Sequence, residues 1–86
     1  REAEITKAPV VSMYPNPVRS ELKIDMGGYS EAVSVNITDI YGRRMLVKTI
    51  KGAAIIPMVM MPSGVYMVTV TGNDGRILNQ SKIVKE

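Results

Sequence analysis

Three aspartates come nearest to carrying chemistry in this sequence. Asp25, Asp39 and Asp74 have the side chains from which a carboxylate pair or an oxygen-ligand calcium site is built. Asp39 and Asp74 lie in glycine-containing turns, DIYG and NDG, where aspartate is favoured because its side chain accepts hydrogen bonds from nearby backbone amides. We therefore expect these aspartates to shape turns, and we predict no metal site and no carboxylate catalysis.

Nucleophilic catalysis has no better support. Ser81 and Lys82 are neighbours in a predicted strand, where successive side chains point to opposite faces, so the two cannot form a serine-lysine dyad. The chain has no cysteine and no histidine, which excludes thiolate catalysis, disulfide bonds, zinc fingers and histidine general-base chemistry. A small hydrolase therefore has almost no residue support, and we predict that the protein is not an enzyme and uses no cofactor.

The size and composition are those of one small globular domain. The chain has 86 residues, of which 45% are hydrophobic and 22% charged. Its net charge of +3 is spread along the sequence, with Arg43-Arg44 as the only adjacent basic pair, and the interleaving of basic and aromatic residues typical of a single-strand nucleic-acid binder is missing. No apolar run approaches the ~20 residues that cross a bilayer as a helix. We expect neither nucleic-acid binding nor a transmembrane segment.

The apolar residues follow the period of β-strands. Segments 18–26, 33–38 and 65–71 alternate with a period of two, which gives each strand one buried and one exposed face. No segment keeps a helical period over the ~11 residues that a helix assignment needs. The side chains expected to form the core are Leu22, Ile24, Val33, Val35, Ile37, Tyr66, Val68 and Val70.

Turn residues divide the chain into seven short strands. Pro15-Asn16-Pro17 predicts a rigid extended corner, and Gly42 is available for positive φ in a hairpin turn. The apolar run 54–61 contains Pro57, which cannot donate to a ladder and belongs on an edge strand or at a bulge. Residues 1–9 show no sustained period and are predicted to be a linker. Residues 10–86 are predicted to be an all-β domain, a seven-stranded antiparallel β-sandwich of the immunoglobulin-like kind.

Methionine is abundant, with seven residues in the chain. A methionine-rich surface can bind many partners, but these methionines fall in or beside predicted strands, in a chain without phenylalanine or tryptophan. We therefore expect them to fill the core. Met60 and Met61 flank a turn and are the pair expected to be exposed.

Four motifs, in order along the chain, resemble a known family. Tyr14-Pro15-Asn16-Pro17 with the strand ELKID, then ITDIYGRR, then MPSGVYMVTV, and finally SKIVKE resemble the C-terminal sorting domain of the type IX (Por) secretion system of Bacteroidetes, from about Val10 to Glu86. The positions that match the family's motifs are Pro15, Asn16 and Pro17 in the proline corner, Gly42 in the hairpin, Gly64 and Tyr66 in the Gly-x-Tyr strand, and Lys82, Ile83, Val84 and Lys85 at the end.

The resemblance implies a secretion signal. A cargo protein N-terminal to the domain is carried through the periplasm after Sec export, recognised by the outer-membrane translocon, and delivered to the cell surface or secreted. A sortase-like cysteine protease then removes the domain during surface attachment. We expect the cleaved bond within residues 1–12, since a protease needs several residues of extended, unpaired backbone and only this part of the chain offers them.

The final segment is where two functional interpretations differ. Ile83 and Val84 are expected on opposite faces of a strand, with Lys82 and Lys85 offering charges to a receptor groove. A receptor that adds a strand to an exposed edge would need no special side chains. The alternative is an immunoglobulin-like or carbohydrate-binding accessory module of a surface protein. Such a module normally exposes tryptophan or tyrosine, and the expected burial of Tyr66 weakens this alternative.

Overall fold

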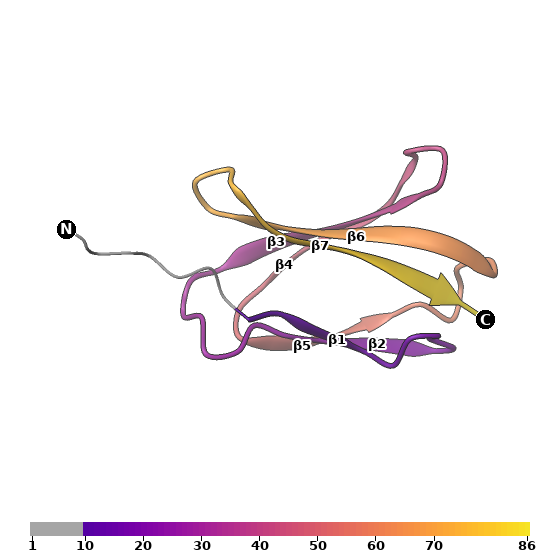
Figure 1. The fold of residues 1–86 in the computed structure, drawn as a ribbon, viewed down its shortest axis with the longest axis horizontal. Coiled ribbons are helices and arrows are strands. Elements are labelled where there is room, and N and C mark those ends of the chain that lie inside the picture. Colours follow the sequence, from indigo (N-terminus) through magenta and orange to yellow (C-terminus); the bar gives the residue numbers. More distant parts are fainter. Residues whose placement is uncertain (1–9) are drawn as a thin grey trace.

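Period-two alternation becomes strand structure throughout the part of the chain that the computed structural model describes, residues 10–86 (Figure 1). The predicted linker, residues 1–9, lies outside the described residues. No helix occurs between residues 10 and 86. The strands are β1 (Ser12–Tyr14), β2 (Glu21–Asp25), β3 (Val33–Asp39), β4 (Arg44–Ile50), β5 (Ala53–Pro57), β6 (Gly64–Gly72) and β7 (Ile77–Lys85).

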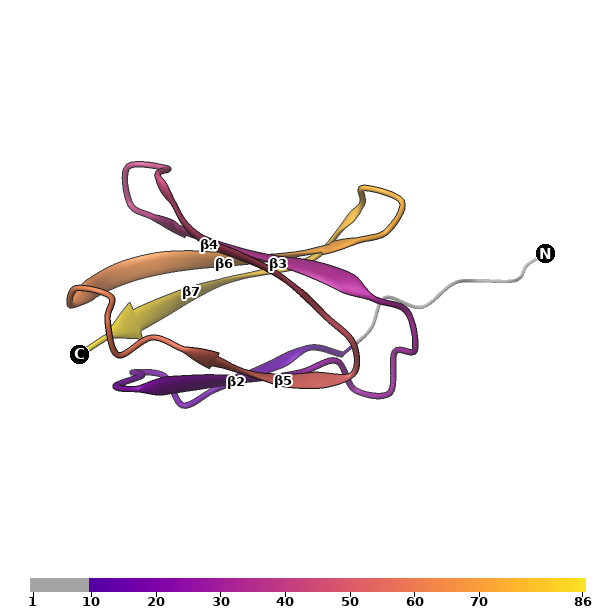
Figure 2. The same ribbon diagram turned by 180° about the vertical axis from the view of Figure 1, so that it is seen from behind.

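The seven strands form two sheets that pack face to face (Figures 1 and 2). One sheet has three strands in the order β1-β2-β5, and the other has four in the order β4-β3-β6-β7. Every pair of neighbouring strands is antiparallel. A single parallel bridge, Val18 to Lys85, joins the loop between β1 and β2 to the end of β7. The predicted seven-stranded antiparallel sandwich is therefore observed.

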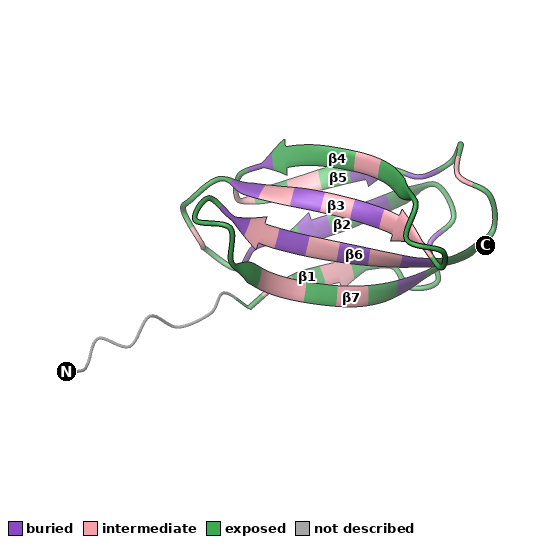
Figure 3. Cartoon of the chain, turned by 90° about the horizontal axis from the view of Figure 1, so that it is seen from above, coloured by how far each residue is buried: buried purple, intermediate pink, exposed green. Residues whose placement is uncertain are grey.

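The core lies between the sheets, and its inward-facing residues are those that the alternation picks out. Figure 3 shows buried and more exposed residues following one another along β3 and β6. All eight predicted core residues are buried. Six further residues complete the core: Val18, Met26, Ile50, Ile56, Met58 and Ile83.

The edge strands explain where the alternation is weak. β4 is an edge strand that pairs only with β3, and Ile50 is its one buried residue. Most side chains on both faces of β4 contact solvent, so the sequence of this strand has no clear alternation. Pro57 lies in β5, which pairs only with β2, as predicted for a residue that cannot donate to a second ladder. The run expected to extend to Met61 ends earlier, because residues 58–61 form a turn in which the Met61 N–H donates to the Met58 carbonyl at 2.9 Å.

The methionines largely behave as core fillers. Met26 and Met58 are fully buried, while Met13 and Met61 are half-buried and pack against the core. Met60 is 91% exposed, as predicted. The prediction that Met61 is exposed with it is wrong, because Met61 is half-buried and packs against the core.

Candidate functional site

Parts of all four sequence motifs meet at one end of the sandwich: the β1–β2, β3–β4 and β5–β6 connections and the end of β7 lie on the same side of the antiparallel sheets. We call this the motif end and define it as residues 15–20, 40–43, 58–66 and 82–86. Figure 1 shows the C-terminus and these turns at one end, and the entry of the chain at residue 10 at the opposite end. Segments from near the beginning and from the end of the described residues therefore share one surface region.

The proline corner contacts the end of β7 through the side chain of Asn16. Its Nδ2 donates to the Lys82 carbonyl at 3.2 Å, and its Oδ1 accepts from the Val84 N–H at 3.0 Å. The flanking Tyr14-Pro15 and Asn16-Pro17 peptide bonds are both cis. The first and last motifs of the chain are thus directly joined.

Val18 continues this contact with its backbone. Its N–H donates to the Val84 carbonyl at 2.8 Å, and its carbonyl accepts from the Glu86 N–H at 2.8 Å. Together with Asn16, Val18 occupies the outer edge of β7 from Lys82 to Glu86. A receptor cannot add a strand along this part of the edge while these hydrogen bonds are in place.

The side chains of the final segment divide between core and surface. Ile83 is buried and Val84 is 38% exposed, so they point to opposite faces as predicted. Lys82 is exposed. The expectation that Lys85 also offers a free charge is wrong: Lys85 is only 7% exposed, and its Nζ donates to the Glu86 carbonyl at 2.9 Å. Strand alternation places Lys85 on the same face as Ile83, where the side chain is covered.

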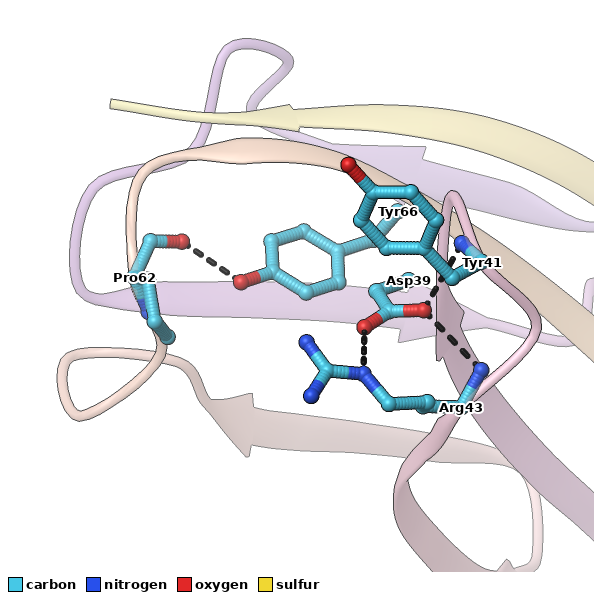
Figure 4. A network of polar contacts seen from close by, with 5 residues as sticks. All are labelled: Asp39, Tyr41, Arg43, Pro62 and Tyr66. Atoms are coloured by element: carbon cyan, nitrogen blue, oxygen red, sulfur yellow. Dashed lines mark hydrogen bonds and ion pairs between the residues drawn. The ribbon is translucent and has the colours of Figure 1, made fainter.

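The Gly-x-Tyr strand lies beside this segment. Gly64 pairs with Lys85 and Tyr66 with Ile83 in the β6–β7 ladder. Tyr66 is 4% exposed, and its hydroxyl donates to the Pro62 carbonyl at 2.6 Å (Figure 4). A tyrosine that bonds back to the backbone a few residues upstream is a known device for fixing a corner in sandwiches. Tyr66 therefore ties the β5–β6 turn to the core.

Asp39 organises the turn between β3 and β4, as the sequence predicts. Its Oδ1 accepts from the N–H groups of Tyr41 and Arg43, both at 2.9 Å, and its Oδ2 accepts from the Arg43 Nε at 2.7 Å (Figure 4). Gly42 completes the turn with a φ of +81°, where a side chain would be strained. Burial alone raises the pKa of Asp39, but these hydrogen bonds and the Arg43 charge outweigh it, so the pKa lies below its ordinary value.

The other two candidate aspartates also serve turns. The Asp25 carboxylate accepts from the Gly27 N–H at 2.8 Å, and that of Asp74 accepts from the Arg76 N–H at 3.0 Å. Both turns lie at the end of the sandwich opposite Asp39. Over residues 10–86, no three acidic side chains gather into a group that would hold a metal ion.

Two hollows on the surface of residues 10–86 bear on the question of a pocket. One lies at the motif end, lined by residues that include Tyr41, Arg43 and Val65, and it encloses about 190 Å³, less than the roughly 300–1,000 Å³ of small-molecule pockets. The other, of about 400 Å³, lies on the outer face of the three-stranded sheet and is lined by residues that include Tyr14 and Lys23.

Exposed apolar side chains are concentrated at the motif end, which the sequence did not predict. For Ile40 and Tyr41, the sequence did hold a sign of exposure, because both residues lie between a turn-forming aspartate and a glycine. Val65 and Val84 are directly paired across the β6–β7 ladder, on the outer face. The exposed apolar residues at this end are Ile40, Tyr41, Val59, Met60, Val65 and Val84.

These features define the class of the protein as an immunoglobulin-like β-sandwich module. A solved structure of a DUF3244 family protein with an immunoglobulin-like β-sandwich fold from Bacteroides vulgatus ATCC 8482 is similar to it, with a TM-score of 0.74 and 17% identity over 88% of this chain and 83% of that one. The model of the secretion system C-terminal sorting domain family matches residues 12–86. The chain belongs to this family, the sorting domains of type IX secretion, and the predicted resemblance is confirmed. Comparison with curated proteins gives no match.

Membership gives the module its general role. Type IX sorting domains are secretion signals rather than enzymes, and they engage the secretion machinery so that a protein is exported toward the cell surface or secreted. Within residues 10–86 there is no helix long and apolar enough to cross a membrane. Because the family's members are secretion signals, we treat the motif end as a candidate recognition surface.

Proposed function

We propose that the domain directs a cargo protein, N-terminal to it, across the outer membrane through the type IX translocon and is then removed by a sortase-like cysteine protease. The observation that carries this proposal is the position of the motifs. The turns of the first three motifs and the final segment lie at the motif end, while the chain enters at the opposite end (Figure 1). A receptor on the motif end therefore stays clear of the cargo, and the cargo-side junction stays accessible to a protease.

The residues proposed to form the sorting signal are of two kinds. Lys82 and Val84 project from the motif end, and the others shape it: Pro15, Asn16, Pro17, Gly42, Gly64, Tyr66, Ile83 and Lys85. Lys82 pairs with Met67, and Val84 with Val65, across the ladder. The outward surface is thus one cation beside an apolar strip, which suits a partner surface that is both apolar and acidic.

Cleavage is proposed within residues 1–12, at the junction between linker and domain. β1 begins at Ser12 and has three residues. Ser12 is therefore the first residue that pairs in a β-ladder, and it is the last residue of the proposed range. Mass spectrometry of the domain released into culture medium measures the position. A new N-terminus beyond Tyr14 would place the cut inside the sandwich and contradict the proposal.

The sorting role is tested by fusing the 86-residue chain behind a periplasmic reporter in a type IX-competent bacterium and measuring the reporter at the cell surface. Deletion of 82–86 abolishes surface delivery if the segment is the signal, but it also removes the buried Ile83, at a cost of about 1.5–3 kcal/mol of folding free energy. A sharper variant is Lys82→Ala with Val84→Ser, because both side chains are exposed and the core is untouched.

The matched control is Ile77→Ser, which removes an exposed apolar side chain from the opposite end of the same strand. We expect the double variant to stay in the periplasm and the control to reach the surface like the unmodified fusion. Equal delivery of all three would contradict a role for the outward face of Lys82 and Val84.

A carbohydrate-binding accessory module is the second candidate, and the hollow on the three-stranded sheet favours it. Tyr14 is half exposed there beside Lys23, an aromatic ring next to a hydrogen-bond donor of the kind that sugar sites use. Tyr66 is buried and offers no platform. Binding of a glycan by the chain, lost in Tyr14→Ala, together with failure of the unmodified fusion to reach the surface, would favour this candidate over the sorting role.

A further inference from the structure

A short parallel ladder lies along the outer edge of β7. One of its two steps is made by a side chain instead of the backbone. Its backbone part is Val18, which donates to the Val84 carbonyl and accepts from the Glu86 N–H. In a parallel ladder the pattern repeats every two residues, so residue 16 should donate to the Lys82 carbonyl and accept from the Val84 N–H. Those are the two groups that Asn16 bonds, and it bonds them with its side chain.

The carboxamide of Asn16 thus stands in for a peptide group. It offers a carbonyl acceptor and an NH2 group, and one N–H of that group takes the place of the backbone donor. The local chain path explains the need for a substitute, since residues 15–17 lie outside β1 and β2 and the backbone at residue 16 does not continue the ladder. Aspartate at this position would lack the donor, and alanine would lack both groups.

We propose that Asn16 is the positioning residue of the sorting signal: its carboxamide extends the Val18 ladder by one step and holds Lys82 and Val84 in the fixed strand that presents their side chains. The proposal rests on the proposed function for its biological consequence, but its structural part is independent of secretion. The proline corner and residues 82–86 form one composite unit: the corner positions the segment, and the translocon binds the segment.

Local order, rather than global stability, is what Asn16 controls. Asn16 itself is exposed and contributes nothing to the core. The antiparallel hydrogen bonds between β6 and β7 do not depend on Asn16. The N–H and C=O groups of Val84 point away from β6, toward the proline corner. Those of Ile83 therefore point toward β6, where Ile83 pairs with Tyr66. Loss of the carboxamide should therefore free the Val84 amide and leave the Ile83 amide protected.

The structural part is tested by amide hydrogen exchange on the 86-residue chain, comparing Asn16→Ala with Asn73→Ala. Asn73 is the matched control, since it is an exposed asparagine with one side-chain hydrogen bond, to Glu31, at the opposite end. We expect exchange at Val84 to become about tenfold faster or more in Asn16→Ala, with Ile83 unchanged, and no change at Val84 in Asn73→Ala. Asn16→Asp retains the acceptor for Val84 and should restore most of its protection.

The functional part uses the same variants in the surface-delivery assay. Asn16→Ala should lower delivery severalfold and Asn16→Asp should recover part of it, while Asn73→Ala and the core variant Val35→Ala, which weakens the fold without touching the ladder, should be delivered like the unmodified chain. Unchanged exchange at Val84 in Asn16→Ala overturns the ladder role. Faster exchange with normal delivery overturns the positioning role, and failure of the unmodified fusion itself instead contradicts the proposed function.

Discussion

Replacing Tyr66 with phenylalanine isolates one hydrogen bond at the motif end. The ring stays in the core, and only the hydroxyl that donates to the Pro62 carbonyl at 2.6 Å is lost. Pro62 lies in an exposed turn, so water can solvate its carbonyl after the change. The cost is therefore that of an ordinary neutral hydrogen bond, about 1 kcal/mol, rather than that of a buried group left without a partner.

For a domain of this size, about 1 kcal/mol corresponds to a fall of roughly 4–8 °C in Tm. Urea unfolding should show the same loss with an unchanged m-value, because the surface exposed on unfolding hardly changes. Tyr41→Phe is the control, because Tyr41 is 80% exposed. The unfolding free energy of this variant should stay within about 0.5 kcal/mol of that of the unmodified chain. A Tyr66→Phe variant as stable as the unmodified chain would refute the view that this bond ties the β5–β6 turn to the core.

Two further predictions concern the core and the β3–β4 turn. Val68→Ala should lower the unfolding free energy by about 1–3 kcal/mol, from lost burial and the cavity left behind, and urea unfolding measures it; a loss below the error of the measurement would mean that the two sheets do not pack at Val68. Asp39 has a lowered pKa in the folded state, so its contribution to stability is fully present above its unfolded pKa of about 3.9 and is lost as pH falls through the lower folded value. Asp39→Asn should therefore lower Tm at neutral pH and flatten the fall of Tm below about pH 4, and an acid limb as steep as that of the unmodified chain would show that another carboxylate is responsible.

Local patterns predicted the core well, because burial in a sandwich is decided by alternation along each strand. All eight residues chosen on that basis are buried, and Asp39 serves its turn as the DIYG sequence indicates. Lys85 was misjudged since residue type suggested exposure, whereas strand parity placed it with Ile83 on the covered face. Weighting parity above residue type would have corrected this prediction.

The sequence alone did not predict the contacts between segments that are far apart in the chain. The motif list contained both Asn16 and Val84, but nothing in either segment shows that one side chain bonds the other's backbone. That contact depends on the order of the strands in the sheets, and a period of two fixes only which face of a strand is buried. The concentration of apolar residues at one end was hidden for the same reason.

The ladder between the proline corner and the end of β7 also sets an order of events in folding. Asn16 and Val84 are 68 positions apart, so closing this contact requires most of the described chain to be in place first. Contacts of such long range carry a large loop-closure cost and form slowly, while the hairpins β3–β4 and β6–β7 need only local closure. A chain that is still being synthesised or threaded through a narrow channel lacks the last residues of this ladder. The motif end is therefore complete only when residues 82–86 are in place beside the proline corner, so this surface forms late in folding.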